Sequence, residues 1–269
     1  MKYLKKLLLG MMITTICLVN VANAGLISSW SLNGHHEDST ENGHDGSGSS
    51  LPGFVADASG SGYGESASFN NNYIALNQSF SGEGSLSELS VSAWFKTTAT
   101  GDTKRHSNWA LLDFDRSEFF NLFVTVKGAI GFSTHSASGI DDMVSSISAL
   151  NDGNWHHVAV TYGNSEGKKI YIDGVLDSAV ASMGAMGSSD TRYGFIGDGS
   201  EARIFDGNRN ELYYDGLISN VNLWDNALSA SEVRASALEV RAEVPEPTTL
   251  AIFALGIIGL ATRRFKRNS

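Results

Sequence analysis

One stretch, from Asp152 to Ala181, limits the possible folds of this chain more than any other. Its first run, WHHVAVTY from Trp155 to Tyr162, alternates side chains between two faces, as a β-strand does. After a polar turn, a second run from Lys168 to Ile172 ends at Asp173-Gly174. Asp-Gly between β-forming residues is a strong hairpin signal, because both central residues of that turn take positive φ. The stretch therefore predicts an antiparallel hairpin, with a third strand over Val175–Ala181.

The rest of the body has the same rhythm of short β-forming runs, with turn residues at intervals of roughly ten residues. It does not alternate strands with long helices, so we predict no parallel βαβ units. The only convincing helix signal is Ser229-Ala230-Ser231-Glu232, a capping box that opens a helix to about Val240. These patterns predict an all-β antiparallel sandwich with one short C-terminal helix. Other predicted strands are Leu26–Leu32, two within Ser66–Leu76, Leu89–Thr97, Trp109–Phe114, Phe119–Lys127, Ala129–Ser133, Met143–Ile147, Arg192–Gly197 and Leu212–Trp224, with loops at Ser49–Gly64 and Ser136–Asp142.

The first 24 residues have the pattern of an export signal. Three lysines precede an apolar core, and Ala22-Asn23-Ala24 matches the cleavage site of a secretory signal peptide. A permanent membrane anchor is the alternative interpretation. The only cysteine, Cys17, lies inside this segment, so the exported body that begins at Gly25 cannot rely on disulfides.

The tail, residues 241–269, has three parts in a fixed order. Pro245-Glu246-Pro247 is a rigid breaker, an apolar run from Leu250 to Ala261 follows it, and a cluster of Lys and Arg closes the chain. This order resembles a PEP-CTERM sorting signal, which implies an exosortase as partner and a transmembrane segment with its basic end inside. The apolar run has 12 residues, short of the ~20 of a typical span, so its flanking residues must extend it. A buried core helix is the alternative.

Without these two segments the body is strongly acidic. Between Gly25 and Val244 there are 12 Lys and Arg and 28 Asp and Glu residues, which gives a net charge of about −16. Nucleic-acid binding requires cations that replace the counterions of the phosphates, so we expect no nucleic-acid partner. About 220 residues suffice for one large sandwich with a real core.

Four blocks of the body, in the right order, resemble the laminin-G-like jellyroll domains of the concanavalin A-like lectin/glucanase group. They are the loop Asp38–Gly46, the strand containing VSAWFK, the hairpin containing WHHVAVTY and YIDG, and the closing run GLISNVNLWDNALSASEV from Gly216 to Val233. The resemblance spans nearly the whole body. It implies one antiparallel jellyroll β-sandwich domain over residues 25–240.

Within the first block the residue types suit Ca²⁺, which takes six to eight oxygen ligands. Asp38 and Asp45 can supply carboxylate oxygens, and Asn42 can supply an amide or carbonyl oxygen. Members of the family often add an acidic residue on the closing strand, where this chain has Ser219 and Asn220. The alternative is a metal-free loop held by Asx-turns.

Two groups of histidines are weaker candidates for metal binding. His156 and His157 are neighbours on one strand, so their side chains face opposite sides and cannot hold one ion together. His35, His36 and His44 have no cysteine partner and no regular spacing. We expect a structural, hydrogen-bonded role for the histidine pair.

Three aromatic residues, Trp109, Tyr213 and Tyr214, lie at predicted strand ends near polar loops. Their rings can stack on sugars there, although packing at the rim of the sandwich is the more common role. The segment from Asp113 to Glu118 superficially resembles the catalytic strand of laminarinase-type glycosidases, which need paired carboxylates on one face. Its first acid is Asp rather than Glu, and a turn near Arg116 breaks the spacing.

These features together predict an exported, non-catalytic binding module. The resemblance implies recognition of a glycan or an extracellular protein, by analogy only, because fold does not fix function. We expect the tail to anchor the chain in the inner membrane during sorting, before it reaches the cell surface or the exopolysaccharide matrix. A hydrolase or lyase acting on polysaccharides is the alternative function, and a structural spacer without ligand is a third.

Overall fold

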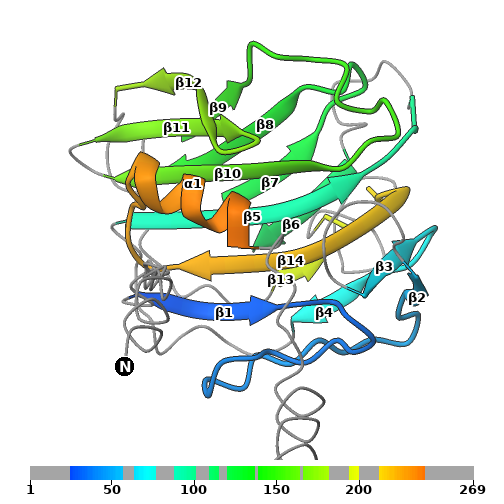
Figure 1. Cartoon of the computed structure of the whole chain (residues 1–269). Helices are drawn as coiled ribbons and strands as arrows, with labels where there is room; N and C mark the ends of the chain where they lie inside the picture. Colours follow the sequence, from blue (N-terminus) through cyan, green and yellow to red (C-terminus); the bar gives the residue numbers. More distant parts are fainter. Residues whose placement is uncertain are drawn as a thin grey trace, which may run out of the picture.

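Two antiparallel β-sheets lie face to face, and one helix covers the outer side of the larger sheet (Figure 1). The computed structural model describes residues 25–56, 64–76, 88–100, 109–114, 120–136, 139–163, 166–181, 194–199 and 212–239. Sheet A consists, in spatial order, of β12 (Val175–Val180), β11 (Gly167–Ile172), β10 (His156–Gly163), β5 (Glu88–Lys96), β14 (Gly216–Trp224), β3 (Glu65–Phe69) and β2 (Gly53–Ala56), and β1 (Leu26–Trp30) also pairs with β14. Sheet B consists of β4 (Ile74–Leu76), β13 (Gly194–Ile196), β6 (Trp109–Phe114), β7 (Phe120–Val124), β8 (Ile130–Ser136) and β9 (Gly139–Val144). The helix is α1 (Ala230–Glu239).

The predicted hairpin is confirmed and occupies one side of sheet A. Strands β10 and β11 pair antiparallel, with Val160 opposite Ile170. The turn between β11 and β12 has positive φ at both central residues, 50° at Asp173 and 77° at Gly174, as the Asp-Gly signal predicts. On its other side β10 pairs with β5, which places the hairpin directly beside the strand that contains VSAWFK.

Two parts of the predicted strand pattern are wrong. Residues Gly53–Ala56 form β2, paired with β3, although we predicted a loop there. Strand β9 begins at Gly139, inside a second predicted loop, because it pairs with β8 as the edge strand of sheet B. Both are edge strands, whose pairing depends on a distant partner more than on their own sequence.

The inner faces of the two sheets form the main core. Alternate residues of β10, such as Val158 and Val160, point into it together with Phe95 of β5. From sheet B, Leu122 and Phe132 pack against them. The alternation predicted for β10 is confirmed, because Ala159 belongs to a separate cluster on the outer face.

That second cluster joins α1 to the outer face of sheet A. Trp224 and Tyr171 of the sheet pack with Leu228 and with Val233 of the helix. The capping box is confirmed: the Ser229 N–H donates to Glu232 Oε2 at 2.7 Å, and the Glu232 N–H donates to Ser229 Oγ at 3.3 Å. The helix thus covers the part of the outer face of sheet A around Tyr171 and Trp224.

Candidate binding site

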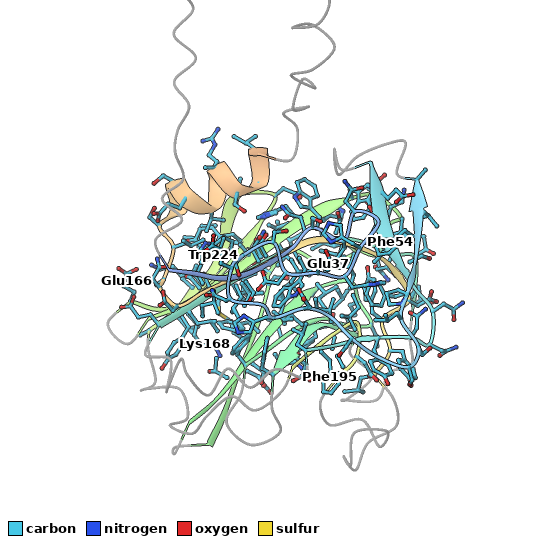
Figure 2. The ribbon with its side chains drawn as sticks, turned by 90° about the horizontal axis from the view of Figure 1, so that it is seen from below. Glu37, Phe54, Glu166, Lys168, Phe195 and Trp224 are labelled. Atoms are coloured by element: carbon cyan, nitrogen blue, oxygen red, sulfur yellow. The ribbon has the colours of Figure 1, made fainter. Side chains whose placement is uncertain are left out.

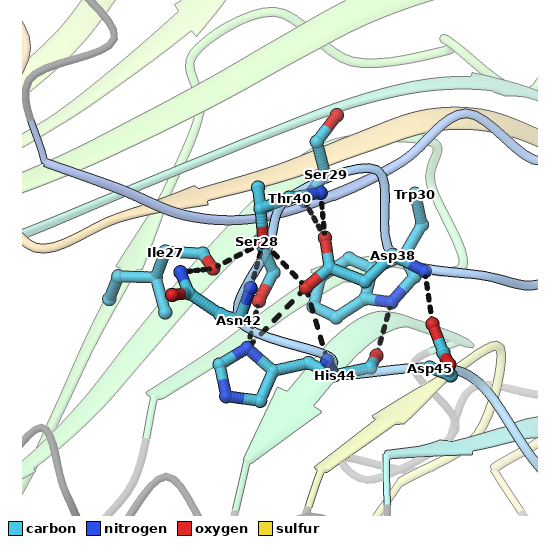
Figure 3. Close-up of polar contacts among 9 residues, drawn as sticks. All are labelled: Ile27, Ser28, Ser29, Trp30, Asp38, Thr40, Asn42, His44 and Asp45. Atoms are coloured by element: carbon cyan, nitrogen blue, oxygen red, sulfur yellow. Dashed lines mark hydrogen bonds and ion pairs between the residues drawn. The ribbon is translucent and has the colours of Figure 1, made fainter.

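The loop after β1 is organised around the carboxylate of Asp38 (Figure 3). Its Oδ1 accepts hydrogen bonds from the N–H groups of Ser29 and Thr40, both at 2.9 Å. Its Oδ2 accepts from the Thr40 hydroxyl at 2.8 Å and from the His44 N–H at 3.2 Å. The side chain of Asp38 is fully buried. Asp38 therefore fastens both halves of the loop to β1.

The other two residues predicted as calcium ligands lie in the same loop. Asp45 Oδ1 accepts a hydrogen bond from the Asp38 N–H at 2.9 Å. Asn42 donates from Nδ2 to the Ile27 carbonyl at 2.7 Å. The structure thus brings Asp38, Asn42 and Asp45 together, and each of them holds the backbone of the loop.

This arrangement does not fit a calcium ion bound by Asp38. The two carboxylate oxygens of Asp38 have two lone pairs each, and four hydrogen-bond donors occupy all of them. Asp38 therefore has no lone pair left for Ca²⁺, which takes six to eight oxygen ligands. On the closing strand, Ser219 Oγ and the Asn220 N–H both donate to the Ser31 carbonyl, at 3.3 and 3.1 Å. The contacts give the loop a structural role, and calcium here stays a prediction.

The histidines of the first loop have separate partners. His35 Nε2 contacts Ser31 Oγ at 3.2 Å, and His36 Nε2 contacts the Pro52 carbonyl at 3.0 Å. His44 Nδ1 contacts Ser28 Oγ at 2.6 Å. In the part of the chain that the structure describes, no three His, Cys, Asp or Glu side chains gather as a metal site.

The histidine pair of β10 faces two sides, as predicted. His156 Nδ1 lies 3.1 Å from Asp173 Oδ2, and this hydrogen bond raises the pKa of His156. His157 is buried on the outer face of sheet A, where its ring meets the Trp94 ring edge-on at 5.4 Å. Burial lowers the pKa of His157 to about 4, so it is neutral at pH 7.

A continuous line of side chains crosses the outer face of sheet B. Successive strands pair Phe195 with Asp113, Asp113 with Asn121, Asn121 with Ser133, and Ser133 with Asp142. We call these five residues the sheet B row. Their sequence neighbours, such as Phe114, Leu122 and Phe132, point into the core, so the row itself points outward.

Hydrogen bonds between strands fix the polar members of the row. Asn121 Nδ2 donates to Asp113 Oδ2, and Ser133 Oγ donates to Asp142 Oδ1. Asp113, Phe195 and Ser133 are buried, Asn121 is partly exposed and Asp142 is exposed. Figure 2 shows Phe195 on the side of the sandwich opposite Trp224 and the helix.

Aromatic residues extend the row at the β13 end. Tyr73, Ala75 and Phe195 form a buried cluster, against which Tyr213 packs with part of its surface exposed. We call these four residues the aromatic patch. The rings of Tyr73 and Phe195 meet edge-on, with centroids 6.2 Å apart. Tyr213, predicted as a ligand-stacking residue, therefore lies beside the sheet B row.

The prediction for Tyr214 is wrong. Its side chain has no exposed surface and belongs to the main core, where it meets Phe69 edge-on at 6.2 Å. The two tyrosines are neighbours in the sequence and point to opposite sides of the chain, so only Tyr213 can meet a ligand from outside. Trp109 begins β6, and its side chain lies outside the described residues.

Sequence reasoning missed most of the sheet B row. Asn121 and Ser133 each interrupt an apolar strand, which is a weak sign of an outward position. Their alignment with Asp113 requires the strand order β6-β7-β8-β9, which no local pattern shows. The glycosidase-like alternative pairs Asp113 with Asp115 or Glu118, and both of these lie outside the described residues.

The two terminal segments also lie outside the described residues. They include the predicted signal peptide, residues 1–24, and the Pro245-Glu246-Pro247 tail. No helix in the described part of the chain is long and apolar enough to cross a membrane.

Comparison with known proteins gives curated relatives and solved structures. The chain is 30% identical over 122 residues to "Sushi, von Willebrand factor type A, EGF and pentraxin domain-containing protein 1" of Rattus norvegicus; the match covers 44% of this chain and 3% of that protein's length. The Mus musculus protein of the same name matches equally. The chain thus spans a small fraction of the curated relatives it matches.

Solved structures share the fold at low identity. Domain 4 of AbnA, a GH43 extracellular arabinanase from Geobacillus stearothermophilus solved with arabinotriose, matches with a TM-score of 0.62 and 21% identity, covering 80% of this chain and 98% of that one. The binding domain of botulinum neurotoxin DC, solved with rat synaptotagmin II, gives 0.58 and 10%, covering 80% and 52%.

Family models match two separate parts of the chain. A PEP-CTERM protein-sorting motif matches residues 243–267, in agreement with the resemblance of the tail. The model for the concanavalin A-like lectin/glucanases superfamily matches residues 68–234, which include most of both sheets and the capping box. With this sandwich and these matches, the chain belongs to the laminin-G-like members of the concanavalin A-like lectin/glucanases superfamily.

Proposed function

We propose that this protein is an exported, non-catalytic module that binds a glycan through the outer face of sheet B. The observation that carries the proposal is the partly exposed ring of Tyr213, which packs on the buried part of the aromatic patch beside the sheet B row. Sugars present an apolar face and a rim of hydroxyl groups. The exposed part of the Tyr213 ring, on the same face of the sandwich as the partly exposed amide of Asn121 and the exposed carboxylate of Asp142, complements both features.

The solved neighbours support binding as the general activity. The arabinanase domain was solved with a sugar, and one similar botulinum neurotoxin type C structure concerns interaction with two ganglioside molecules. Another neurotoxin domain was solved with a protein receptor. Protein recognition is therefore the competing ligand class, and the partly exposed ring of Tyr213 beside polar side chains makes us prefer a glycan.

The sorting motif supports a place of action outside the cytoplasm. A tail of this kind implies handling by an exosortase, with the apolar run in the inner membrane during sorting. We propose that the body then acts at the cell surface or in the extracellular polysaccharide matrix. The absence of cysteine after Gly25 means that its fold needs no oxidative maturation there.

Catalysis by Asp113 receives little support from its contacts. Glycosidases that act through two carboxylates need an acid and a base or nucleophile flanking the scissile bond. Asp113 instead accepts a hydrogen bond from Asn121 and is buried in the row. We propose that it orders the binding face.

The test is a glycan array probed with the full chain in mild detergent. Tyr213→Ala should weaken binding by about tenfold, because a stacked aromatic ring contributes about 1–1.5 kcal/mol. Val175→Ala, which truncates an exposed side chain on edge strand β12 of sheet A, should not change binding. A blank array would overturn the proposal, and release of reducing ends that is lost in Asp113→Asn would replace it with a hydrolase.

A further inference from the structure

We propose that an apolar corner of the body, formed by Val175 and Leu176 of β12 and Leu238 of α1, rests on the lipid surface of the membrane while the tail is anchored there. This contact keeps the Pro-Glu-Pro motif close to the bilayer for the exosortase. The inference rests on membrane anchoring by the tail, which the sorting motif implies, and is independent of glycan recognition.

The three side chains of the apolar corner each expose about half of their surface or more. Val175 is 67% exposed, Leu238 56% and Leu176 49%. A single exposed apolar side chain is normal on a protein surface, whereas several together mark a contact surface. Their grouping is therefore the feature to explain.

The end of α1 and the start of β12 lie side by side. Gly174, directly before β12, approaches the helix so closely that a Cβ atom placed on it would lie 3.2 Å from the Cβ of Ala237. Leu176 pairs with Tyr171, which belongs to the cluster that joins α1 to the outer face of sheet A. Residues paired across two strands point to the same side of a sheet, so Leu176 lies on the helix side.

The exposed face of α1 adds a cation to the apolar corner. Val233, Ser236 and Ala237 are buried, whereas Arg234 and Leu238 are exposed and, being four residues apart, share one helix face. An apolar side chain beside a cation suits the interface of a bilayer with anionic headgroups. The net charge of the body, about −16, opposes general adhesion to such lipids, so a contact must come from local groups.

The position of the tail favours the bilayer as the surface that covers this corner. Helix α1 ends at Glu239, and the apolar run of the tail begins at Leu250, so only residues 240–249 separate them. Ten residues span at most about 35 Å when fully extended and about 17 Å on average as a flexible coil. The end of α1 is therefore held close to the bilayer, and the tether makes the contact intramolecular, so a weak contact suffices.

Site-specific fluorescence tests the inference with the full chain, in which Cys17 is replaced by Ser. Leu176→Cys or Leu238→Cys then carries an environment-sensitive dye, and the tail is inserted into vesicles of phosphatidylcholine and phosphatidylglycerol. Interfacial apolar groups enter a bilayer by only ~5–10 Å, so the emission should shift to the blue and be quenched by lipids with a shallow nitroxide. Val144→Cys is the matched control, because Val144 is 50% exposed on β9 of sheet B, and its emission should stay as in water.

A charge placed in the corner locates the contact. Leu238→Glu in the chain labelled at position 176 should abolish the blue shift, because a carboxylate is repelled by anionic lipid and is costly to bury. Val144→Glu introduces the same charge at an exposed site on the other sheet and should leave the shift unchanged.

The outcomes separate the bilayer from the other surfaces that fit an apolar corner. Water-like emission at positions 176 and 238, or an equal shift at position 144, would overturn the contact. A shift that appears only at high protein density would assign the corner to a second copy of the chain, and one that appears only when an exosortase is added would assign it to that enzyme. Failure of the chain to float with the vesicles would overturn membrane anchoring itself.

Discussion

Two carboxylates of this protein, Asp38 in the first loop and Asp142 on sheet B, have opposite surroundings. Asp38 is fully buried, and most of its donors are backbone N–H groups of its own loop and of β1 (Figure 3). Asp142 is exposed, and its donor is the hydroxyl of Ser133 on the neighbouring strand. Both occur in acidic segments, and sequence alone does not separate them.

The difference shows how to distinguish a structural acid from one available to a ligand. A carboxylate whose lone pairs are all used by buried donors holds the fold, and removing it leaves those donors without an acceptor. A carboxylate with one side-chain donor at a sheet edge keeps accepting capacity toward the outside. Stability and binding measurements should therefore respond oppositely to changes at the two sites.

The largest expected effect is the loss of Asp38. Asp38→Ala leaves four donors without their acceptor in a buried place, so the free energy of unfolding should fall by about 3–5 kcal/mol. Urea unfolding followed by tryptophan fluorescence measures the change. Asp45→Ala is the matched control, because it removes one hydrogen bond from an exposed acid and should cost only about 1 kcal/mol.

The same pair of variants tests calcium. Because four donors occupy the carboxylate of Asp38, millimolar Ca²⁺ should leave the melting temperature of the wild type unchanged. A rise in the wild type that disappears in both variants would show instead that the loop rearranges around an ion, since a ligand that binds only the folded state stabilises it.

A second prediction extends the contrast to a buried polar group that lacks partners. His157 is 1% exposed, and its Nδ1 has no hydrogen-bond partner within the described chain. Burial lowers the pKa of His157 to about 4, while an unfolded chain titrates near 6.5. Between these values the unfolded chain binds a proton and the folded chain does not. Stability should therefore fall by on the order of 3 kcal/mol as the pH drops through that window.

In His157→Phe the free energy of unfolding should depend less on pH between 7 and 4. Urea unfolding at a series of pH values in this range measures the dependence. His156→Gln is the control of opposite sign. The hydrogen bond to Asp173 raises the pKa of His156, so that its stabilising contribution is full below about pH 6.5 and is lost as the pH rises through the raised pKa. An unchanged slope in His157→Phe would mean that other groups set the acid sensitivity.

The sequence predicts those parts of the fold whose signals are local. The Asp173-Gly174 turn, the alternation of β10 and the Ser229–Glu232 capping box each depend on a few adjacent residues, and all are confirmed. The predicted strand Leu212–Trp224 begins too early, because β14 starts at Gly216. Its alternation separates Tyr213 from Tyr214, but the sequence does not show which of the two rings enters the core.

The proposed binding face was still less accessible to sequence reasoning. Asp113, Asn121, Ser133 and Asp142 are separated by between 8 and 12 positions along the chain and become neighbours only through the strand order of sheet B. The first loop shows the converse problem. Its residue types suit a cation, and only the donors around Asp38 reveal that the carboxylate serves the backbone.

The smallest expected effect on stability is at Asp142, whose carboxylate is exposed whereas that of Asp38 is buried. Asp142→Asn keeps an oxygen that can accept the Ser133 hydroxyl, and the side chain is exposed, so the free energy of unfolding should change by less than about 0.5 kcal/mol. Urea unfolding in parallel with the glycan array measures stability and binding on one sample. A variant that keeps wild-type stability but weakens glycan binding would place Asp142 in the proposed binding face. A loss above about 2 kcal/mol in Asp142→Asn would instead give both acids the same structural role.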